Sequence, residues 1–338
     1  MSNLFKRACC FTDIHFGLKS NSLQHNADCL DFVDWIIKIS KEEGCDTGIF
    51  MGDWHHQRSA INLQTLNFSL QALEKLGKAF SQFFFIVGNH DLYYRDRRDI
   101  HSAAWAKHIE GVTLVDDWLI DGDTAIIPWL VGDDYKKIQK LNNQYVFGHF
   151  ELPHFFMNAM VEMPDHGDIH AEDFQGVGEV FSGHFHKRQR RGNIHYIGNC
   201  FPHNFADAGD TNRGCMILDW GLEPRYHAWD SQPLYSVLDL SAIIDSGDKL
   251  LSDRQHVRVR LDIDISYEEA NFIKETFIKQ YSLREMALIP NKRSEWEEDL
   301  SPGEIKFESV DQIVTDQLTK IESDHYDPKL LLDIYRTL

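Results

Sequence analysis

The chain has 338 residues, and its 34 basic and 53 acidic side chains give it a formal net charge of −19. With 43% hydrophobic residues it can bury a sizeable core, so disorder over the whole chain is not expected. The negative charge argues against a protein that coats nucleic acid by itself. It leaves room for an enzyme of nucleic acid whose carboxylates bind metal ions or whose partner is basic.

A secretory signal is not expected, because residues 1–7 carry charges and Asp13 interrupts the apolar run that follows. A transmembrane helix is not expected, because no apolar run reaches about 18 residues. The six cysteines, at positions 9, 10, 29, 45, 200 and 215, form no CxxC pair. We therefore predict reduced, buried thiols in a cytoplasmic protein that does not contact a membrane.

Short apolar runs that end abruptly in polar residues recur through residues 1–200. Such runs predict strands that are buried on both faces. In chain order the runs and the residues after them are Ala8–Phe11 before Asp13 and His15, Gly48–Met51 before Gly52 and Asp53, Phe83–Val87 before Gly88, Asn89, His90 and Asp91, Tyr145–Phe147 before Gly148 and His149, and Val180–Ser182 before Gly183, His184 and His186.

Helical spacing of apolar residues separates the first three runs, at 30–39, which stops near Gly44, and at 63–80. Further strands are predicted at 112–115, 124–127, 196–198 and 214–220. The turn at 121–123 separates the first two of these from each other or from a hairpin partner. This alternation predicts right-handed βαβ crossovers and a mostly parallel or mixed sheet.

The pattern changes after residue 232, where the histidine clusters end. Residues 256–265 alternate strictly, as in a half-exposed strand, and a helix is predicted at 267–281. We expect a main domain at 1–232, a small α+β domain at 233–290, and a linker with a helical tail at 291–338.

The polar residues at the strand ends predict a metal site, because ligands of open α/β sheets bind beyond the carboxyl ends of the strands. Any one of these pairs alone would also fit a solvated turn or surface histidines. Together they mix carboxylate, imidazole and amide donors, which suits manganese, iron or zinc. They exceed the three or four ligands of one catalytic zinc, so two ions are predicted. The converging residues are Asp13, His15, Asp53, Asn89, His90, His149, His184 and His186.

The order Asp-x-His, Gly-Asp, Gly-Asn-His-Asp, Gly-His, Gly-His-x-His resembles the calcineurin-like metallophosphoesterase superfamily over about residues 8–220. The resemblance implies a layered β-sandwich flanked by helices. It also implies two divalent ions, with Mn²⁺ expected, and His90 as the acid for the leaving oxygen, oriented by Asp91 or a neighbour. The implied ligands are Asp13, His15 and His186 for one ion, Asn89, His149 and His184 for the other, and Asp53 for both.

His56, three residues after Asp53, makes the chain similar to the SbcD-type (Mre-type) DNA double-strand-break repair nucleases rather than to the protein phosphatases. More narrowly the chain resembles the compact phage recombination endonuclease subunits. This implies a DNA exonuclease or endonuclease of recombination, repair or replication, which uses a two-metal-activated hydroxide. His56 would then shape the phosphate or the adjacent base stack. The chain departs from the family at Asn199-Cys200, where a small hydroxyl residue is common, and at His55, where an apolar or aromatic residue is usual.

The resemblance further implies partners. The tail would dock an SbcC-type coiled-coil ABC ATPase in a heterotetramer that contains two copies of this chain, acting on double-stranded ends and single-stranded DNA in the cytoplasm (the host's, if phage-encoded). The small domain would cap the site. The tail has an alternative interpretation as a helix packed on its own catalytic domain. The function has two alternative interpretations: a small-molecule phosphodiesterase or phosphatase of the same superfamily, and a metal-bound scaffold that recruits the ATPase and cleaves nothing.

Overall fold

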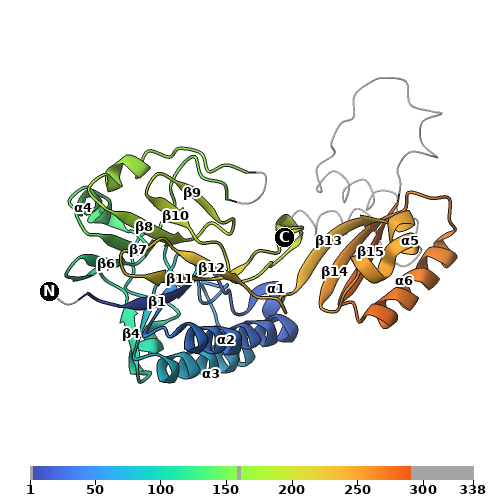
Figure 1. The fold of residues 1–338 in the computed structure, drawn as a ribbon, viewed down its shortest axis with the longest axis horizontal. Helices are drawn as coiled ribbons and strands as arrows, with labels where there is room; N and C mark the ends of the chain where they lie inside the picture. Colours follow the sequence, from blue (N-terminus) through green and yellow to red (C-terminus); the bar gives the residue numbers. More distant parts are fainter. Residues whose placement is uncertain (1–2, 158–160, 291–338) are drawn as a thin grey trace, which may run out of the picture. The chain divides into compact units, whose positions relative to one another are not determined.

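The computed structural model describes residues 3–157 and 161–290. The chain divides into two compact units, Met1–Ile289 and Pro290–Leu338, so the predicted linker and tail lie outside the described residues. The first unit contains two six-stranded sheets flanked by helices (Figure 1), which confirms the α/β class and the layered sandwich. Among the described residues, no helix is both long and apolar enough to cross a membrane.

The first sheet has the strand order β12-β11-β1-β2-β3-β4. Strands β1 to β4 are parallel neighbours, whereas β11 is antiparallel to β1 and β12 to β11. The carboxyl ends of β1, β2 and β3 therefore lie at one edge. The bounds are β1 (Arg7–Phe11), β2 (Thr47–Met51), β3 (Gln82–Ile86), β4 (Val112–Val115), β11 (Gly214–Asp219) and β12 (Arg225–Ala228).

The second sheet has the order β5-β6-β7-β8-β10-β9. Its central strands β6, β7, β8 and β10 are parallel, and the edge strands β5 and β9 are antiparallel to their neighbours. The turn at 121–123 thus joins a hairpin. The bounds are β5 (Leu119–Asp121), β6 (Thr124–Ile127), β7 (Tyr145–His149), β8 (Glu179–Gly183), β9 (Gln189–Arg191) and β10 (Ile194–Tyr196).

The position of β1 between two layers explains why its sequence is continuously apolar. Ala8 and Cys10 belong to the core between the two sheets, whereas Cys9 and Phe11 belong to the core beneath the helices. Because successive side chains point to opposite faces, a strand covered on both sides needs apolar residues at every position. The described structure has all six cysteines as free thiols, five of them buried, as predicted.

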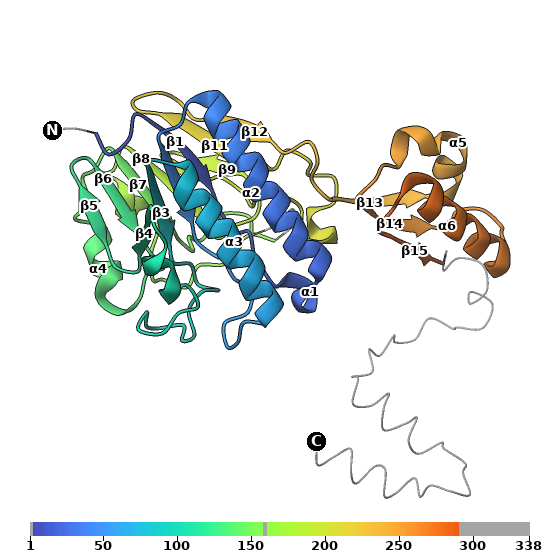
Figure 2. The ribbon, with the colours of Figure 1, turned by 90° about the horizontal axis from the view of Figure 1, so that it is seen from below.

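Two long helices, α2 (Leu23–Glu43) and α3 (Leu63–Ala79), lie side by side against the first sheet (Figure 2). Helix α2 ends at Gly44, in the left-handed conformation, as expected. It begins seven residues before the predicted start, at the N-cap Ser22. Apolar periodicity misses this first part because its polar residues are buried: Asn26 accepts a hydrogen bond from the backbone N–H of Gly17 at 2.8 Å.

Residues after 232 form a third sheet, β13-β14-β15, in which all neighbours are parallel and alternate with α5 and α6. The predicted strand at 256–265 is shorter, since β14 ends at Arg260, but its alternation of buried and more exposed positions is as expected. The predicted division at residues 232 and 233 stays a prediction. The bounds are β13 (Leu234–Asp239), α5 (Leu240–Leu250), β14 (Gln255–Arg260), α6 (Tyr267–Tyr281) and β15 (Glu285–Ile289).

Short helices complete the connections. These are α1 (Leu18–Asn21), α4 (Tyr135–Ile138) and the 3-10 helices η1 (Ala104–His108), η2 (Gly132–Asp134), η3 (Ala171–Phe174) and η4 (Phe205–Asp207).

Candidate metal centre

The loops after β1, β2, β3, β7 and β8 bring the predicted ligands together. Two groups of potential ligand atoms, each within 4.8 Å of one another, share Asp53. One contains Asp13 and His15, and the other contains His149 and His184. A common carboxylate between two groups is the arrangement that a pair of ions needs.

The backbone at these strand ends adopts an unusual conformation. Four of the predicted ligands are non-glycine residues with positive φ: Asp13 (54°), His15 (53°), Asp53 (63°) and His184 (85°). Such residues cost of order 1–3 kcal/mol each and cluster at functional sites. They are held by hydrogen bonds between the loops, from Asp13 N–H to Gly52 O at 3.0 Å and from His15 N–H to Asp53 O at 3.1 Å.

Gly52 permits the close approach of two strand ends. Its φ is 97°, and a Cβ atom there would lie 2.4 Å from Nδ1 of His149 and 2.9 Å from the Cα of Gly88. A side chain at this position would therefore separate β2 from β7, the strands that carry Asp53 and His149.

Asp53 lies at the centre of the site and is almost completely buried. Its Oδ2 is 3.4 Å from Nε2 of His149 and 3.7 Å from Nε2 of His15, while its Oδ1 accepts the backbone N–H of His90 at 2.8 Å. Burial alone would raise the pKa of Asp53, but His149 and His15 hold it well below its usual range. The carboxylate is therefore charged.

The second group has its rings oriented by the protein. Nδ1 of His149 is 2.7 Å from the backbone oxygen of Met51, which can only accept, so this nitrogen donates and Nε2 faces the site. In the same way Nε2 of His184 is 2.9 Å from Oε2 of Glu151, which leaves Nδ1 for the site. Such outer partners fix the tautomer of a metal-binding histidine.

The inward-facing atoms of this group have ligand-like spacing. Oδ1 of Asn89 is 2.9 Å from Nε2 of His149 and 3.0 Å from Nδ1 of His184. Adjacent donors around an octahedral ion lie about 3 Å apart when each is about 2.1 Å from the ion. Burial lowers the pKa of His149, but the Asp53 carboxylate outweighs burial and raises this pKa to about 9. A bound cation would displace that proton.

The first group contains buried polar atoms that lack partners in the described part of the chain. These are Oδ1 of Asp13 and both ring nitrogens of His15. Oδ2 of Asp13 is held by the Thr12 hydroxyl at 2.7 Å and by the backbone N–H of His184 at 3.0 Å. The His186 ring lies 5.4 Å from that of His15. Unsatisfied buried groups cost about 1–3 kcal/mol each, and a metal ion would satisfy these. The donor set therefore fits a divalent cation.

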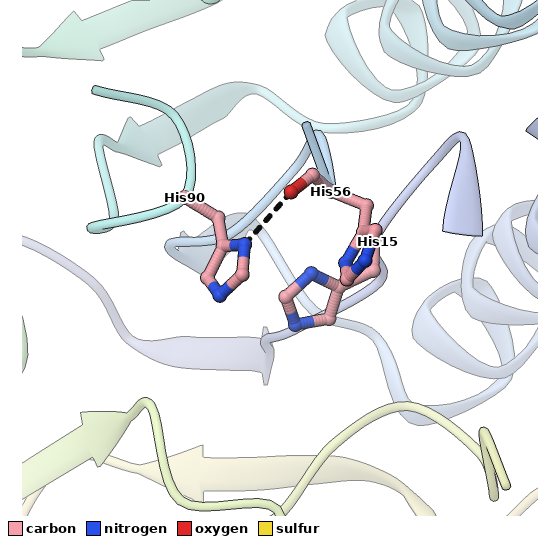
Figure 3. Close-up of side chains that lie close together, drawn as sticks. All are labelled: His15, His56 and His90. Atoms are coloured by element: carbon pink, nitrogen blue, oxygen red, sulfur yellow. Dashed lines mark hydrogen bonds between the residues drawn. The ribbon is translucent and has the colours of Figure 1, made fainter. Parts of the chain in front are cut away.

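His90 and His56 adjoin the first group (Figure 3). Nδ1 of His90 donates to the backbone oxygen of His56 at 2.8 Å, and the two rings stack with centroids 5.3 Å apart. The His15 ring is 4.9 Å from His90 and 5.4 Å from His56. With Nδ1 bound to the His56 carbonyl, Nε2 is the ring nitrogen of His90 that is left for other partners.

Asp91 does not orient His90. Of the two alternatives, Asp91 or a neighbour, the structure shows the neighbour, through the His56 carbonyl. The Asp91 carboxylate is fully buried and accepts the backbone N–H groups of Asp53, Trp54, His55 and Gly88 at 3.0–3.3 Å. It therefore fastens the loop after β2 to the loop after β3 and has a structural role.

The two departures from the family pattern also have structural roles. His55 is buried, and its ring nitrogens lie 2.9 Å from the Ser102 hydroxyl and 3.1 Å from that of Ser69. Asn199 accepts a hydrogen bond from the buried Arg213 at 2.5 Å. The thiol of Cys200 donates to the backbone oxygen of Thr12 at 3.0 Å, which supports the loop that carries Asp13.

Two residues at the site were missed by the sequence reasoning. Glu151, which holds His184, lies two residues after His149 and belongs to none of the five blocks. His203 lies against His15 and His186, but it follows no predicted strand and stands in no histidine pair. The available signal was its position shortly after the last histidine block.

Comparison with known proteins gives a similar protein from a bacteriophage. No family model matches the chain. The chain is 28% identical over 220 residues to exonuclease subunit 1 of enterobacteria phage T4, a match that covers 62% of this chain and 64% of that protein's length. This similarity agrees with the predicted resemblance to a phage nuclease subunit, although the match spans less than two thirds of that protein's length.

Three solved structures are also similar. A phosphoesterase from E. coli has a TM-score of 0.36 and 14% identity, covering 67% of this chain and 94% of its own. A dimetal phosphatase from Danio rerio has a TM-score of 0.39 and 10% identity, covering 62% and 91%. A nuclease from Pseudomonas putida has a TM-score of 0.28 and 19% identity, covering 56% and 66%.

Proposed function

We propose that this chain is a metal-dependent nuclease that hydrolyses phosphodiester bonds in DNA. The observation that carries the proposal is the pair of ligand groups that share Asp53, whose carboxylate also accepts the backbone N–H of His90. The similarity to a phage exonuclease subunit supports a nucleic acid as the substrate.

The proposed ligands are those that the resemblance implies, and the preferred ion is Mn²⁺. Asp13, His15 and His186 would hold one ion, Asn89, His149 and His184 the other, and Asp53 both. When bound, such a pair polarises the phosphate and activates a water molecule for attack on phosphorus.

The residues around the ions perform the remaining steps. His90, with Nδ1 donating to the His56 carbonyl, can supply a proton from Nε2 to the departing sugar oxygen. Help of this kind contributes about 10²–10⁴-fold. The His56 ring, stacked on His90, limits its rotation and lines the position of the phosphate.

A basic and aromatic loop after His90 favours a polymer over a small phosphate ester. Tyr93 and Tyr94 are exposed and contact each other, with ring centroids 4.7 Å apart. Burial and the charge of Arg95 lower the pKa of Arg58, whereas the Asp53 carboxylate raises it. Basic side chains suit a phosphate backbone, and exposed aromatic rings suit stacked bases.

The partner and the biological setting are also part of the proposal. The chain would act in DNA recombination, repair or replication in the host cytoplasm, as one of two copies in a heterotetramer with an SbcC-type coiled-coil ATPase. Residues 233–290 would cap the site, and residues 291–338 would dock the ATPase. A basic partner would also compensate for the net charge of −19.

The test is the release of nucleotides from an end-labelled linear duplex with Mn²⁺, using the wild type and His90→Asn. We expect metal-dependent release that falls about 10²–10⁴-fold in the variant, while metal binding is retained. Absence of release, both alone and with the ATPase, would contradict the proposal.

The second candidate, a small-molecule phosphodiesterase, is favoured only by the site itself, which would serve either substrate. Tyr93→Leu, with Tyr93→Phe as its control, separates the two. A DNA nuclease should lose affinity for single-stranded DNA in the leucine variant, by about 1 kcal/mol or ~5-fold, and should hydrolyse a nitrophenyl phosphodiester as before. Turnover of the nitrophenyl ester without any DNA cleavage would favour the second candidate.

A further inference from the structure

His203 is a buried histidine beside the metal centre that the ligand pattern does not include. It precedes η4, and its backbone N–H donates to Oδ2 of Asp207 at 2.9 Å. Its ring centroid lies 5.5 Å from that of His15 and 5.3 Å from that of His186. The three residues each offer a ring nitrogen, and these nitrogens lie within 4.8 Å of one another.

The free nitrogen of His203 has no partner in the described residues. Its Nε2 is buried, and the residue is only 1% exposed. The neighbouring His25 does not satisfy it, because Nε2 of His25 lies 3.0 Å from the backbone oxygen of His15 and donates there. Phe201 packs edge-on against the His203 ring at 5.1 Å. An apolar side chain would pack here without this unsatisfied nitrogen.

Two ligand residues beside His203 also have buried atoms without hydrogen-bond partners among the described residues. Both ring nitrogens of His15 and Oδ1 of Asp13 are also buried without partners in the described structure. Each of these three neighbouring residues needs an interaction for a buried atom that is not hydrogen-bonded within the described residues. A bound cation meets this need for all three at once.

We propose that His203 is a direct ligand of the ion that Asp13, His15, Asp53 and His186 bind. This inference rests on the proposed function, and it makes the two halves of the centre unequal. The first half has three imidazoles and two carboxylates. The second has two imidazoles, an amide and the shared carboxylate. Because imidazole favours the later transition metals, the first half should select them more strongly than the second.

Cobalt(II) is a suitable probe, because its visible absorption reports the number and type of its ligands. The full-length protein, stripped with a chelator, is titrated with Co²⁺ alone, as wild type, His203→Gln and His195→Gln. His195 is the matched control: it is also buried, but its Nε2 pairs with Glu179 at 2.6 Å, outside the centre.

We expect two Co²⁺ per chain in the wild type and the control. In His203→Gln the Co²⁺ affinity of one of the two sites should fall by at least about 10–100-fold, the loss that follows removal of an outer-sphere partner. The absorption band of that site should also change. Equal affinity and an identical spectrum in His203→Gln would overturn the proposal while leaving the proposed function intact. Failure of the wild type to bind Co²⁺ would overturn both.

A measurement on the wild type avoids dependence on the folding of a variant. Ligating histidines give proton resonances strongly shifted by Co²⁺. Five shifted imidazole N–H signals are expected with His203 as a ligand, from His15, His186, His203, His149 and His184. Four signals, without His203, would contradict the assignment.

Discussion

The two halves of the metal centre differ in what holds them in place. In the second half the protein orients both rings, since His149 donates to the Met51 carbonyl and His184 to Glu151. In the first half both ring nitrogens of His15 and one oxygen of Asp13 find no partner among the described residues. The second half is therefore preorganised by hydrogen bonds, whereas the first half depends on a cation to complete its interactions.

The largest effect is expected where the halves meet. Asp53→Asn removes the shared charge while keeping the shape of the side chain. Because charge stabilisation by a metal is worth several kcal/mol, nuclease activity should fall at least ~10³-fold. Calorimetric titration with Mn²⁺ should show both binding events weakened.

Asp46→Asn is the control, since Asp46 precedes β2, at the opposite end of the strand that leads to Asp53. It accepts the backbone N–H of Lys6 at 3.2 Å and is outside the ligand groups. Weakening of a single binding event in Asp53→Asn would show that the carboxylate serves only one half.

The parts of the site that the sequence predicts are those in which two signals coincide. Each of the five blocks joins an apolar run to residues of metal-ligand type, and parallel strand order brings three of them to one edge of the first sheet and two to one edge of the second. The resemblance added which residues would share an ion. The structure brings Asn89 to within 2.9 Å of His149 and 3.0 Å of His184.

The supporting residues could not be predicted because their partners are distant in sequence. Glu151 meets His184 across 33 positions, and the pairing of β7 with β8 alone decides this contact. Asp91 was one of the two alternatives for orienting His90, yet its carboxylate accepts backbone N–H groups of the loop after β2. A sequence does not reveal the direction of a carboxylate within a turn.

The second prediction concerns the outer partner of the preorganised half. Glu151→Gln should weaken Mn²⁺ at the second half about 10–100-fold, because a neutral amide orients His184 less well and makes it a poorer donor. The first half should bind as before. The readout is the separation of the two binding constants in a calorimetric titration.

Glu179→Gln gives a matched control, because Glu179 holds His195 in the same way outside the centre. Both Mn²⁺ constants should be unchanged in it. Equal weakening of both halves by Glu151→Gln would mean that the difference between the halves does not govern binding.

The smallest effect concerns stability without metal, and it tests the comparison most directly. His149→Leu removes the hydrogen bond to the Met51 carbonyl, which keeps the Thr12 hydroxyl as a neighbour at 2.9 Å, and this should lower the free energy of unfolding by about 0.5–1.5 kcal/mol. His15→Leu removes two buried nitrogens that have no partner in the described residues, so metal-free stability should stay equal or rise. Urea unfolding in the presence of a chelator measures both. With Mn²⁺ the wild type should be more stable than His15→Leu, because the wild type gains binding energy that the variant loses. If His15→Leu destabilises the metal-free protein as much as His149→Leu does, the first half must be held by interactions other than a cation.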